Sequence, residues 1–485
     1  MAMDPEFELL KYRRTRIVAT LGPASSNDEI ITELVKAGVS MFRLNMSHGN
    51  HDGHRAAYAR VRKAAAAAGR PIAIMADLCG PKIRVGTFRG GSIQLVPGER
   101  VTVTVRDVEG APGLIPSGYA ALADDVRAGN RILLADGVLE LRVDRVEGTE
   151  IDCTVVEGGT LSDHKGINLP GVAVSAPCLT EKDKDDARFA LALGVDYLAL
   201  SFVRRASDVT ELRDLVRSLG GEVGIIAKIE RPEGLENAES ILNAADGVMV
   251  ARGDMGVELP PERVPVAQRF LVDLARTKSK AVIVATQMLE SMIENARPTR
   301  AEVSDVSAAV SSGTDAVMLS AETASGAHPV GAVSMMDRIA RETEGYQFGH
   351  GRFRSIVPGD PSDARPVALA DAIARATAQL SRDLRVRAIF VVSQSGRSAA
   401  EVSSARPAAP IVAVTAVGRT SRRINLLWGV LPVVVSEQDL LDLPATARRL
   451  ALEMGLAVPG QYILTVRGFA PNPAQSTPTV TVLAV

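Results

Sequence analysis

Residues 223–258 read VGIIAKIERPEGLENAESILNAADGVMVARGDMGVE, and they decide the fold because they contain one structural unit and the start of the next. An apolar run, Ile225–Lys228, precedes a segment with helical character, and a second apolar run, Gly247–Ala251, follows that segment. A buried strand followed by a helix is the repeating unit of parallel α/β proteins. Charged side chains close both runs, which points to chemistry at the strand ends.

The same alternation of apolar runs and helical patterns extends in both directions from this stretch. Helix start signals such as Asn27 and Thr180 follow or separate the apolar runs. Eight such units favour a (β/α)8 TIM barrel, whose active site is built at the carboxyl ends of the strands. The predicted barrel strands are Arg16–Thr20, Met41–Leu44, Ile72–Ala76, Tyr197–Ser201, Ile225–Lys228, Gly247–Ala251, Ala281–Thr286 and Ala316–Ser320.

Two further segments interrupt or follow the barrel pattern. Between residues 80 and 176 the pattern changes to alternating β runs with Gly and Pro turns, which predicts an inserted β-barrel-like lid domain, or else a structural appendage. After residue 345 a second βα series predicts a C-terminal α/β regulatory domain. Its expected elements are a helix near Leu369–Leu380, strands at Ala388–Val392, Ile411–Val414 and Val430–Val435, and a helix near Asp439–Glu453. The predicted boundaries are 1–14 for a tag remnant (Met1–Phe7) and N-terminal segment, 15–79 and 177–345 for the barrel, 80–176 for the lid and 346–485 for the C-terminal effector domain.

Composition excludes several classes of protein. The 485 residues carry a formal net charge of −2, and the 55 Lys and Arg residues are scattered, so nucleic acid and membrane are not expected partners. No stretch has the pattern of a secretory signal or of a membrane span. The three cysteines, Cys79, Cys153 and Cys178, have no metal-ligand spacing and fit reduced thiols. We therefore expect a cytoplasmic protein with a small ligand.

The carboxyl ends of the predicted strands carry a concentrated set of charged side chains. Lys228, Glu230 and Asp254 place one ammonium and two carboxylates at neighbouring strand ends, which suits a divalent cation and charge developing on an oxygen. Carboxylate oxygens are ligands that Mg²⁺ or Mn²⁺ prefers. Because charged groups are costly to bury, the clustering favours a functional site over a merely structural Lys228–Glu230 ion pair.

Other strand ends add groups of different chemistry. Arg43 offers a planar guanidinium suited to a phosphoryl group, and Asp77 ends the third strand. Thr286 supplies a hydroxyl able to relay a proton, although a barrel-end Thr can also satisfy only its own backbone. The chain has neither the G-x-x-x-x-G-K-[ST] nor the G-x-G-x-x-G motif, so any phosphates must be met by side chains and metal.

Two motifs lie away from this cluster. His48, His51 and His54 recur every three residues and could indicate a metal patch, but a solvated helix N-terminus is the favoured interpretation. In the C-terminal domain, hydroxyl and small residues follow a predicted strand and open a helix, where free N–H groups can cradle a phosphate. A Ser-rich helix cap is the alternative. The residues of this predicted effector site are Ser393, Gln394, Ser395, Gly396, Arg397 and Ser398.

From about Thr15 to near its C-terminus, the chain resembles the pyruvate kinases. The resemblance implies phosphoryl transfer from phosphoenolpyruvate to ADP, giving ATP and pyruvate in glycolysis, on a barrel with an inserted lid and a regulatory domain. It also implies a homotetramer. The matching motifs are IVATLGPAS (17–25), RLNMSHG (43–49), IAKIERPEG (226–234), VARGDMGVE (250–258), ATQMLESM (285–292), RPTRAEVSDV (297–306) and AVMLS (316–320).

The resemblance implies a role for each matching residue. Glu230 and Asp254 would hold Mg²⁺ (or Mn²⁺), and Lys228 would stabilise the phosphoryl group in flight and the enolate oxygen. Thr286 would lie on the face where the enolate is protonated, through water and Ser320. The residues implied to hold the substrate are Arg43, Lys228, Gly253, Asp254 and Thr286. Those implied to meet the nucleotide as the lid closes are Asn45, His48, Arg84, Asp136 and Lys165.

Two departures from the family pattern carry predictions. Many members have Glu where this chain has Lys82, and in those enzymes Asn45, Ser47, Asp77 and the next carbonyl resemble a K⁺ site. An ammonium at position 82 can replace that ion, which predicts a K⁺-independent enzyme. The segment 468–477 departs from the loop of members regulated by fructose 1,6-bisphosphate, which predicts a sugar monophosphate or nucleotide effector instead.

Two other functions fit part of the same pattern. A metal-dependent pyruvate or enolate aldolase would use the carboxylate pair on the same barrel, but it would not need Arg43, the lid or ADP. A catalytically silent metabolite sensor would keep the effector domain on a decayed barrel. The presence of Lys228, Glu230, Asp254 and Thr286 together argues against such decay.

Overall fold

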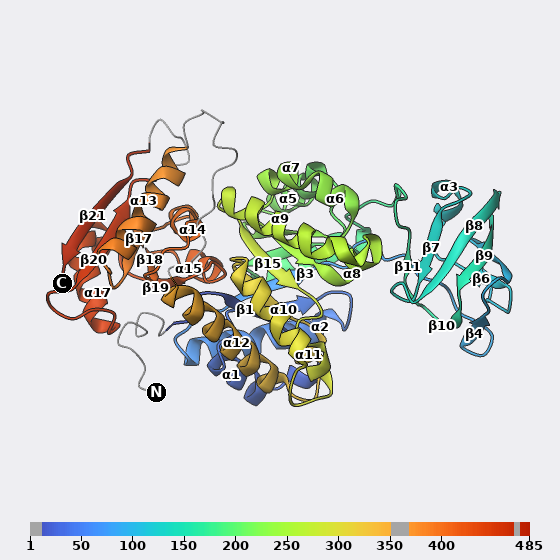
Figure 1. Cartoon of the computed structure of the whole chain (residues 1–485), viewed down its shortest axis with the longest axis horizontal. Helices are drawn as coiled ribbons and strands as arrows, with labels where there is room; N and C mark the ends of the chain where they lie inside the picture. The colour runs from blue at the N-terminus through green and yellow to red at the C-terminus, as the bar shows by residue number, and fades with distance from the viewer. Residues whose placement is uncertain (1–11, 351–367, 470–475) are drawn as a thin grey trace.

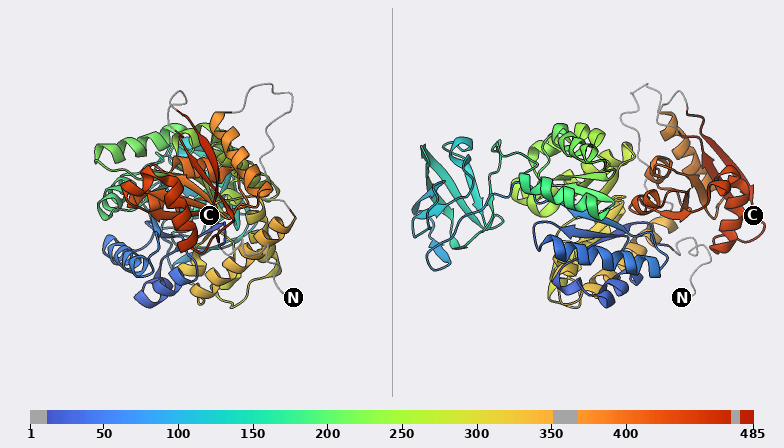
Figure 2. Two further views of the ribbon diagram at one scale, coloured as in Figure 1. Left: turned by 90° about the vertical axis from the view of Figure 1, so that its left-hand side faces the viewer. Right: turned by 180° about the vertical axis from the view of Figure 1, so that it is seen from behind.

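The computed structural model describes residues 12–350, 368–469 and 476–485 of the chain. The predicted tag remnant Met1–Phe7, residues 351–367 after the barrel, and residues 470–475 of the segment expected to differ in effector binding lie outside the described residues. Figure 1 shows three regions in a row, with the barrel between the C-terminal domain and the inserted β domain. The views in Figure 2 give the same arrangement.

Eight parallel strands close into a barrel, which confirms the predicted TIM-barrel fold. The strand order around the barrel is β1-β16-β15-β14-β13-β12-β3-β2. Helices cover the outside and side chains fill the inside, so strands such as β1, β3 and β14 are buried at every position and read as continuous apolar runs. The strands are β1 (Arg16–Thr20), β2 (Met41–Asn45), β3 (Ala73–Asp77), β12 (Tyr197–Leu200), β13 (Gly224–Ile229), β14 (Gly247–Ala251), β15 (Ala281–Ala285) and β16 (Ala316–Leu319).

The barrel helices begin where the sequence offers capping residues. Thr180 and Thr299 each form a capping box, with Asp183 and Glu302 three residues on, at the starts of α4 and α10. The helices are α1 (Asp28–Lys36), α2 (His51–Ala67), α4 (Glu181–Leu193), α5 (Ala206–Ser218), α6 (Pro232–Glu236), α7 (Ala238–Ala244), α8 (Arg252–Glu258), α9 (Val264–Thr277), α10 (Arg300–Ser311), α11 (Ala321–Ala324) and α12 (Pro329–Gly349). Short 3-10 turns are η2 (Pro23–Ser25), η3 (Pro261–Arg263) and η4 (Glu290–Ile293).

The inserted region lies between β3 and α4 and has a core of its own. Its buried residues, from Ile83 to Ala176, form a cluster separate from the barrel core. One sheet has the order β11-β7-β8-β9-β5-β6, and β10 pairs with β4 beside it. The elements are β4 (Ser92–Leu95), β5 (Arg100–Thr104), β6 (Leu114–Pro116), α3 (Leu122–Asp125), β7 (Arg131–Leu134), β8 (Leu139–Glu147), β9 (Glu150–Glu157), β10 (Gly159–Ser162) and β11 (Ile167–Asn168).

The C-terminal domain is a five-stranded sheet with the order β19-β18-β17-β20-β21, in which only β21 is antiparallel. The helix expected over Asp439–Glu453 is broken at Asp442, whose side chain caps a second helix that has Pro444 in its first turn. The elements are α13 (Leu369–Asp383), β17 (Ile389–Val392), α14 (Arg397–Ser404), β18 (Ile411–Thr415), α15 (Gly418–Ile424), β19 (Val430–Val434), α16 (Glu437–Leu441), α17 (Leu443–Glu453), β20 (Tyr462–Arg467) and β21 (Thr479–Ala484).

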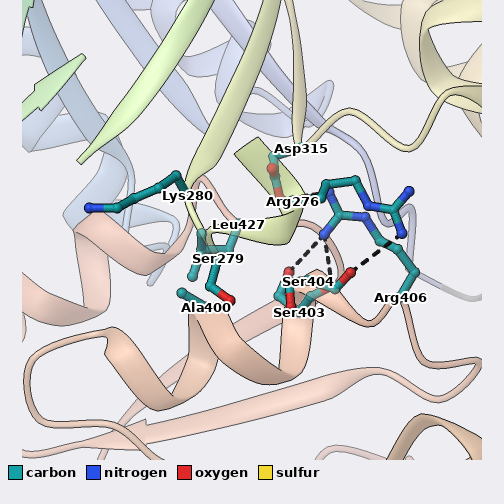
Figure 3. A pocket seen from close by; sticks show the side chains of 9 residues that line it. All are labelled: Arg276, Ser279, Lys280, Asp315, Ala400, Ser403, Ser404, Arg406 and Leu427. Carbon is teal, nitrogen blue, oxygen red and sulfur yellow. Dashed lines mark hydrogen bonds and ion pairs between the residues drawn. The ribbon is translucent and has the colours of Figure 1, made fainter. Parts of the chain in front are cut away.

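The C-terminal domain packs against the amino-terminal ends of the barrel strands. Arg16, at the start of β1, donates from Nε to the carbonyl of Leu427 at 3.0 Å, and Tyr197, at the start of β12, donates to the carbonyl of Arg423 at 3.0 Å. Figure 3 shows one part of this interface, where Arg406 Nη2 lies 3.2 Å from Asp315 Oδ1. The carboxyl ends of the strands, where the site was expected, therefore face away from this domain.

Two arginines and one carboxylate meet in that part of the interface. Arg276 and Arg406 lie beside Asp315, while the Lys280 side chain points away from them (Figure 3). Backbone carbonyls offset the excess positive charge, since Arg406 donates to Gly313 at 2.6 Å and Lys280 to Ala245 at 2.6 Å. The contact thus holds the two domains together through buried, hydrogen-bonded charges.

Within the described residues, no helix has both the length and the apolar character needed to cross a bilayer.

Candidate active site

A pocket opens at the carboxyl ends of the barrel strands. All of the predicted catalytic residues and both predicted metal ligands lie on its wall, together with the predicted monovalent-cation residues. The residues that line it are Arg43, Asn45, Ser47, Asp77, Leu78, Cys79, Lys82, Ser201, Phe202, Lys228, Glu230, Met249, Ala251, Asp254, Thr286, Met318 and Ser320. The structure therefore brings together side chains from seven of the eight barrel strands or from the residues that follow them.

Four charged side chains form the floor of the pocket. Lys228 Nζ lies 2.9 Å from Glu230 Oε1 and 3.5 Å from Asp77 Oδ1. Asp77 also accepts a hydrogen bond from Arg43 Nε at 2.6 Å, and a second Arg43 nitrogen donates to Thr20 at 3.2 Å. Asp77, at the end of β3, reaches Arg43 on the adjacent strand β2 and Lys228 on β13, which lies beyond β12. This carboxylate fixes both Arg43 and Lys228.

Burial and the neighbouring charges set the protonation of this group. Burial alone would lower the pKa of Lys228, but Asp77 and Glu230 raise it above its ordinary value, so the ammonium is retained. Burial would raise the pKa of Asp77, yet Lys228 and Arg43 hold it below its ordinary value. Burial raises the pKa of Glu230 to about 7 in spite of Lys228. Glu230 is thus the carboxylate that most needs a further cation.

The donor set fits a divalent metal ion. Glu230 Oε1 is buried and, within the described part of the chain, receives no hydrogen bond of good geometry, although Lys228 lies close. Asp254 lines the same pocket, so two hard oxygen ligands face one space. No cluster of three or more His, Cys, Asp or Glu side chains within the described ranges is placed to hold a metal. Mg²⁺ commonly takes one or two carboxylates and completes its shell with substrate and water.

The loop after β15 has an unusual backbone that aims Thr286. Thr286 and Gln287 have φ angles of 70° and 54°, a left-handed conformation that β-branched residues seldom adopt. Arg252 holds this turn, since Nη2 donates to the Thr286 carbonyl at 2.7 Å and Nη1 lies within 2.6 Å of Asp305. Gly253, in the first turn of α8, donates its N–H to Thr286 Oγ1 at 2.7 Å. The Thr286 hydroxyl and the Gly253 N–H are therefore held in fixed positions relative to each other.

Ser320 has a hydroxyl that is available for chemistry. Its N–H donates to Glu322 at 2.7 Å, and Glu322 also accepts from the N–H of Leu289 at 3.1 Å. The Ser320 Oγ atom is buried and has no hydrogen-bond partner among the described residues. A buried hydroxyl on the wall of a polar pocket calls for water or a ligand as its partner. Ser320 thus stands ready to hold a water in the pocket.

The predicted monovalent-cation residues come together on one side of the pocket. Asn45, Ser47, Asp77 and Lys82 all line it, and Asn45 Oδ1 accepts from the Ser47 N–H at 3.2 Å. Asp77, however, takes its ion pairs from Arg43 and Lys228. The Lys82 side chain is exposed, and its ammonium has no ion pair within the described residues. Replacement of K⁺ by Lys82 stays a prediction.

The predicted nucleotide residues divide between the pocket and the base of the lid. Asn45 lines the pocket. Arg84 forms a backbone bridge with Gly166 and donates to the His164 carbonyl at 2.8 Å, which places it beside Lys165. Asp136 Oδ1 lies near Gly166 as well, 3.8 Å from the position of a Cβ there.

His48 follows β2 of the barrel and lies close enough to the inserted domain for its charges to act on the imidazole. Burial lowers the pKa of His48, and the positive charges of Lys82 and Arg84 lower it further. Asn168 of the inserted domain donates to Glu258 of α8 at 3.3 Å. The proposed nucleotide residues therefore lie on two domains.

The histidines of the helix N-terminus have ordinary partners. His51 Nε2 lies 2.8 Å from Asp186 Oδ1, and its ring stacks on Phe189 with centroids 3.9 Å apart. His54 Nε2 lies 2.9 Å from the carbonyl of His48. These contacts fit the favoured interpretation of a helix start rather than a metal patch.

The segment between β17 and α14 supplies only part of the predicted cradle. Ser393 Oγ accepts from the N–H of Ala399 at 3.2 Å and so caps α14 itself. Gln394 Oε1 accepts from Thr415 Oγ1 at 3.1 Å, which ties the segment to β18. Gly396 has φ 94°, and a Cβ there would lie 2.9 Å from a methyl group of Ile424. The exposed members are Gln394, Ser395 and Arg397, whereas Ser398 is buried.

Three positions of the site were not singled out in the sequence. Ser201 accepts a hydrogen bond from Lys228, Arg252 supports Thr286, and Glu322 supports Ser320. Ser201 and Glu322 come at or just after the carboxyl ends of predicted strands. Their position at the strand ends was a signal that could have identified both residues, but neither residue belongs to a distinctive motif.

The fold and the pocket define a (β/α)8 barrel with fixed cations and a carboxylate pair at the carboxyl ends of its strands, the arrangement of a barrel enzyme. Comparison with family models matches residues 12–333 to the pyruvate kinase barrel domain and residues 371–483 to the pyruvate kinase alpha/beta domain. The chain belongs to the pyruvate kinase family. It is an enzyme of phosphoryl transfer between phosphoenolpyruvate and ADP in glycolysis, with pyruvate and ATP as products.

Relatives agree with this assignment over nearly the whole chain. The chain is 43% identical to a pyruvate kinase of Mycobacterium tuberculosis over 96% of its own length and 97% of the relative. It is 44% identical to the Geobacillus stearothermophilus pyruvate kinase, over 94% of this chain and 78% of that protein. The crystal structure of a pyruvate kinase from Cryptosporidium parvum has a TM-score of 0.88 and 34% identity, covering 99% of this chain and 97% of that one.

Proposed function

We propose that the chain carries out phosphoryl transfer with Mg²⁺ (or Mn²⁺), without a requirement for K⁺, and under control by a small phosphorylated effector. The observation that carries the proposal is the joint position of Lys228, Glu230 and Asp254 on one pocket wall, beside Arg43. A fixed ammonium, a fixed guanidinium and a carboxylate pair are what transfer of a phosphoryl group between two oxygens requires.

Arg43 and Lys228 would bind the anionic substrate and stabilise the charge that develops during transfer. Asp77 holds Arg43 Nε at 2.6 Å and lies 3.5 Å from Lys228 Nζ, so neither cation needs to reorganise during the reaction. The remaining guanidinium nitrogens of Arg43 suit a bidentate contact with a phosphoryl group. Groups placed before the reaction are worth more than groups that must move into position.

Glu230 and Asp254 would hold the divalent cation, which supplies charge neutralisation and orientation of phosphate oxygens when bound. The carboxylate of the substrate would meet the N–H groups of Gly253, Asp254 and Thr286. Since the Gly253 N–H contacts Thr286 Oγ1 at 2.7 Å, substrate binding would have to share or exchange this hydrogen bond. The hydrogen bond of the Thr286 hydroxyl would therefore change when the substrate binds.

Protonation of the enolate would involve Thr286 and Ser320. The Ser320 hydroxyl, which lacks a partner within the described residues, would hold a water on the pocket wall. Such a water would deliver the proton, with Thr286 as the neighbouring relay. A Ser320→Ala variant would slow enolate protonation more than phosphoryl transfer. Solvent deuterium exchange into the pyruvate methyl group would report the protonation step separately.

The base of the lid would close on the nucleotide. Asn45 and His48 on the barrel and Arg84, Asp136 and Lys165 on the lid would meet ADP from opposite sides. The support is that His48 faces Arg84 and Lys82 while Lys165 and Asp136 gather around Gly166. Closing a lid over the phosphates excludes water from the transfer step.

The monovalent cation would be replaced by Lys82. Its side chain lines the pocket beside Asp77, Asn45 and Ser47, which is the support for this part of the proposal. Pyruvate formation from phosphoenolpyruvate and ADP is measured with Mg²⁺ in buffer free of K⁺ and NH₄⁺, and again with KCl. Equal activity supports the proposal, whereas activity only with KCl rejects the role of Lys82.

A Lys82→Glu variant sharpens the same test. It should lose activity without K⁺ and regain part of it when K⁺ is added. Lys36→Glu, at an exposed position of α1, is the matched control for charge reversal and should respond to neither condition. Indifference of Lys82→Glu to K⁺ would refute the replacement of the ion.

The effector would be a sugar monophosphate or a nucleotide bound at residues 393–398, in a cytoplasmic homotetramer. The exposed Ser395 and Arg397 and the start of α14 support a site for one phosphate. Activation curves with ribose 5-phosphate, glucose 6-phosphate, AMP and fructose 1,6-bisphosphate distinguish the candidates. Strong activation by the bisphosphate alone would refute the assignment, and light scattering would test the tetramer.

A further inference from the structure

The two residues after β12, Ser201 and Phe202, form a corner that touches both members of the central ion pair. Ser201 is 2% exposed and Phe202 is 9% exposed. Phe202 has a φ of 56°, a left-handed conformation that bulky residues rarely adopt. The surrounding structure must hold such a residue in place, and strained positions of this kind concentrate at functional sites.

The hydroxyl of Ser201 has one possible direction. Its oxygen donates to the carbonyl of Leu78 at 2.7 Å, and a carbonyl can only accept. The lone pairs of Ser201 Oγ therefore face Lys228, whose Nζ donates to it at 2.7 Å. With Glu230 Oε1 2.9 Å from the same nitrogen, one hydrogen bond and one ion pair direct the ammonium. Ser201 thus sets the orientation of Lys228.

Phe202 orients Glu230, the other member of the Lys228–Glu230 ion pair. Its backbone N–H donates to Glu230 Oε2 at 2.6 Å. The left-handed turn at Phe202 places this N–H beside Ser201, so one corner holds both Lys228 and Glu230. A shift of the corner would move the ammonium and the carboxylate together.

Both connections between the barrel and the lid rest on this corner. On the outgoing connection, a Cβ at Gly80 would lie 2.8 Å from Phe202 Cδ2 and 3.0 Å from Ser201 Cβ. On the returning connection, Cys178 Sγ donates to the Ser201 carbonyl at 3.1 Å. Arg204, just beyond the corner, donates to the carbonyl of Ala176 at 2.7 Å. The chain enters and leaves the lid over the same two residues.

We infer that the Ser201–Phe202 corner positions Lys228 and Glu230 for phosphoryl transfer and takes its own position from the two connections to the lid. This inference rests on the proposed role of Lys228. Movement of the lid then changes the geometry of the ion pair through direct contacts. Ser201 is a positioning residue, because it acts through Lys228 and has no proposed contact with the substrate.

Ser201 variants test the first half of the inference. Ser201→Ala should lower kcat about 10- to 100-fold, the effect of losing a hydrogen bond to a charged group, with little change in the KM for ADP. Ser201→Thr, which keeps the hydroxyl, should restore kcat to within about fivefold, while Ser201→Cys should not. A kcat for Ser201→Ala within about twofold of the unmodified enzyme, or a loss that Ser201→Thr fails to restore, would overturn the inference.

Lys228→Gln, measured in the same assay, separates the proposed catalytic role of Lys228 from the inferred positioning role of Ser201. If Lys228→Gln is inactive and Ser201→Ala is fully active, the corner has no positioning role and the proposed function stands. If Lys228→Gln keeps full activity, the proposed role of Lys228 fails and this inference fails with it. Thermal unfolding of each variant confirms that the enzyme is folded at the assay temperature.

A pair of glycines tests the second half. Gly80 and Gly171 have φ angles of 68° and 71°, so alanine strains the backbone equally at both positions. Only at Gly80 does the new Cβ meet the corner, because nothing lies within 4 Å of a Cβ at Gly171. Gly80→Ala should lower kcat at least about tenfold, and Gly171→Ala should stay within about twofold. Equal kcat values for the two variants would overturn the coupling to the lid.

Discussion

Replacement of Asp77 by asparagine tests whether one carboxylate organises the whole pocket. Asp77 is 1% exposed and holds Arg43 Nε at 2.6 Å, with Lys228 Nζ at 3.5 Å. Asparagine keeps the shape and one acceptor oxygen but removes the charge. Two buried cations would then lose the anion that offsets the cost of their burial, which Glu230 alone cannot replace because it already faces Lys228.

The size of the effect follows from the burial of the group. Removing one partner of a buried ion pair costs about 3–5 kcal/mol, and the near-zero exposure of Asp77 leaves no solvent screening to reduce it. At about 2–4 °C per kcal/mol for domains of 150–250 residues, the Tm of the barrel should fall by about 6–20 °C. Because Lys228 and Arg43 lose their fixed positions, kcat should fall as well.

The assay is thermal unfolding followed by circular dichroism, without substrates. Glu33→Gln is the matched control, because Glu33 pairs with Lys36 on α1 at 2.8 Å but both side chains are largely exposed. Exposed pairs contribute about 0–1 kcal/mol, so this variant should shift the Tm by less than about 4 °C. Equal shifts for the two variants would refute the reasoning that Asp77 organises the pocket.

The pH dependence gives a second check on Asp77. Lys228 and Arg43 hold its pKa below the ordinary value even though burial opposes them, so the folded state binds the proton more weakly than the unfolded state. The stabilisation is then fully present above the unfolded pKa of about 4 and is lost as the pH falls through the folded pKa. The Tm difference between the unmodified enzyme and Asp77→Asn should therefore be present at pH 8, where both carboxyl groups are ionised, and should shrink below about pH 4.

Three further predictions concern the thiols, the domain interface and the metal ligands. At pH 8, iodoacetamide should modify the half-exposed Cys79 first and Cys153 only after unfolding, because burial raises the pKa of Cys153 to about 12 and likewise raises that of Cys178. Peptide mapping measures this, and equal labelling of the three thiols in the folded enzyme would contradict it. Arg406→Met should lower the Tm, since Arg406 is 2% exposed and its loss removes the guanidinium that lies 3.2 Å from the buried Asp315 carboxylate. An unchanged Tm would show that the interface charges do not hold the domains together. Glu230→Gln should weaken Mn²⁺ binding by at least about tenfold in calorimetry, whereas the exposed Glu262→Gln should not change it.

The barrel could be predicted because its strands are buried on both faces. Such strands are continuous apolar runs, and each of the eight was predicted to within a residue or two of its bounds. The ends depend on chain geometry that a pattern does not contain. Thr286 was assigned to a strand, for example, but its φ of 70° ends β15 at Ala285.

The last two strands of the C-terminal domain were not predicted. Tyr462–Arg467 and Thr479–Ala484 pair antiparallel at the edge of the sheet, and only the first is buried at most positions. A half-exposed edge strand has a weak apolar pattern, so it resembles a loop. The break at Asp442 was also missed, although Pro444 signals it.

The site was predictable in its members but not in its pairings. The rule that barrel chemistry lies at the carboxyl ends of strands nominated Asp77, Lys228 and Glu230. Which cations Asp77 contacts depends on how the strands are arranged around the closed barrel, and the spacing of residues along the chain does not give that arrangement. The structure pairs this carboxylate with Arg43 and Lys228, and the role expected for Lys82 stays a prediction.

The inserted domain has its own core, and both of its connections to the barrel contact the same corner; this has a consequence for how the protein could have been assembled. Its outgoing and returning connections both cross Ser201, and its buried residues form a cluster separate from that of the barrel. A segment that enters and leaves at one point can be inserted into an existing barrel without breaking the closure of the strands. The inserted domain can thus be treated as a module, exchangeable between related enzymes as long as its contacts with Ser201, just after β12, are kept.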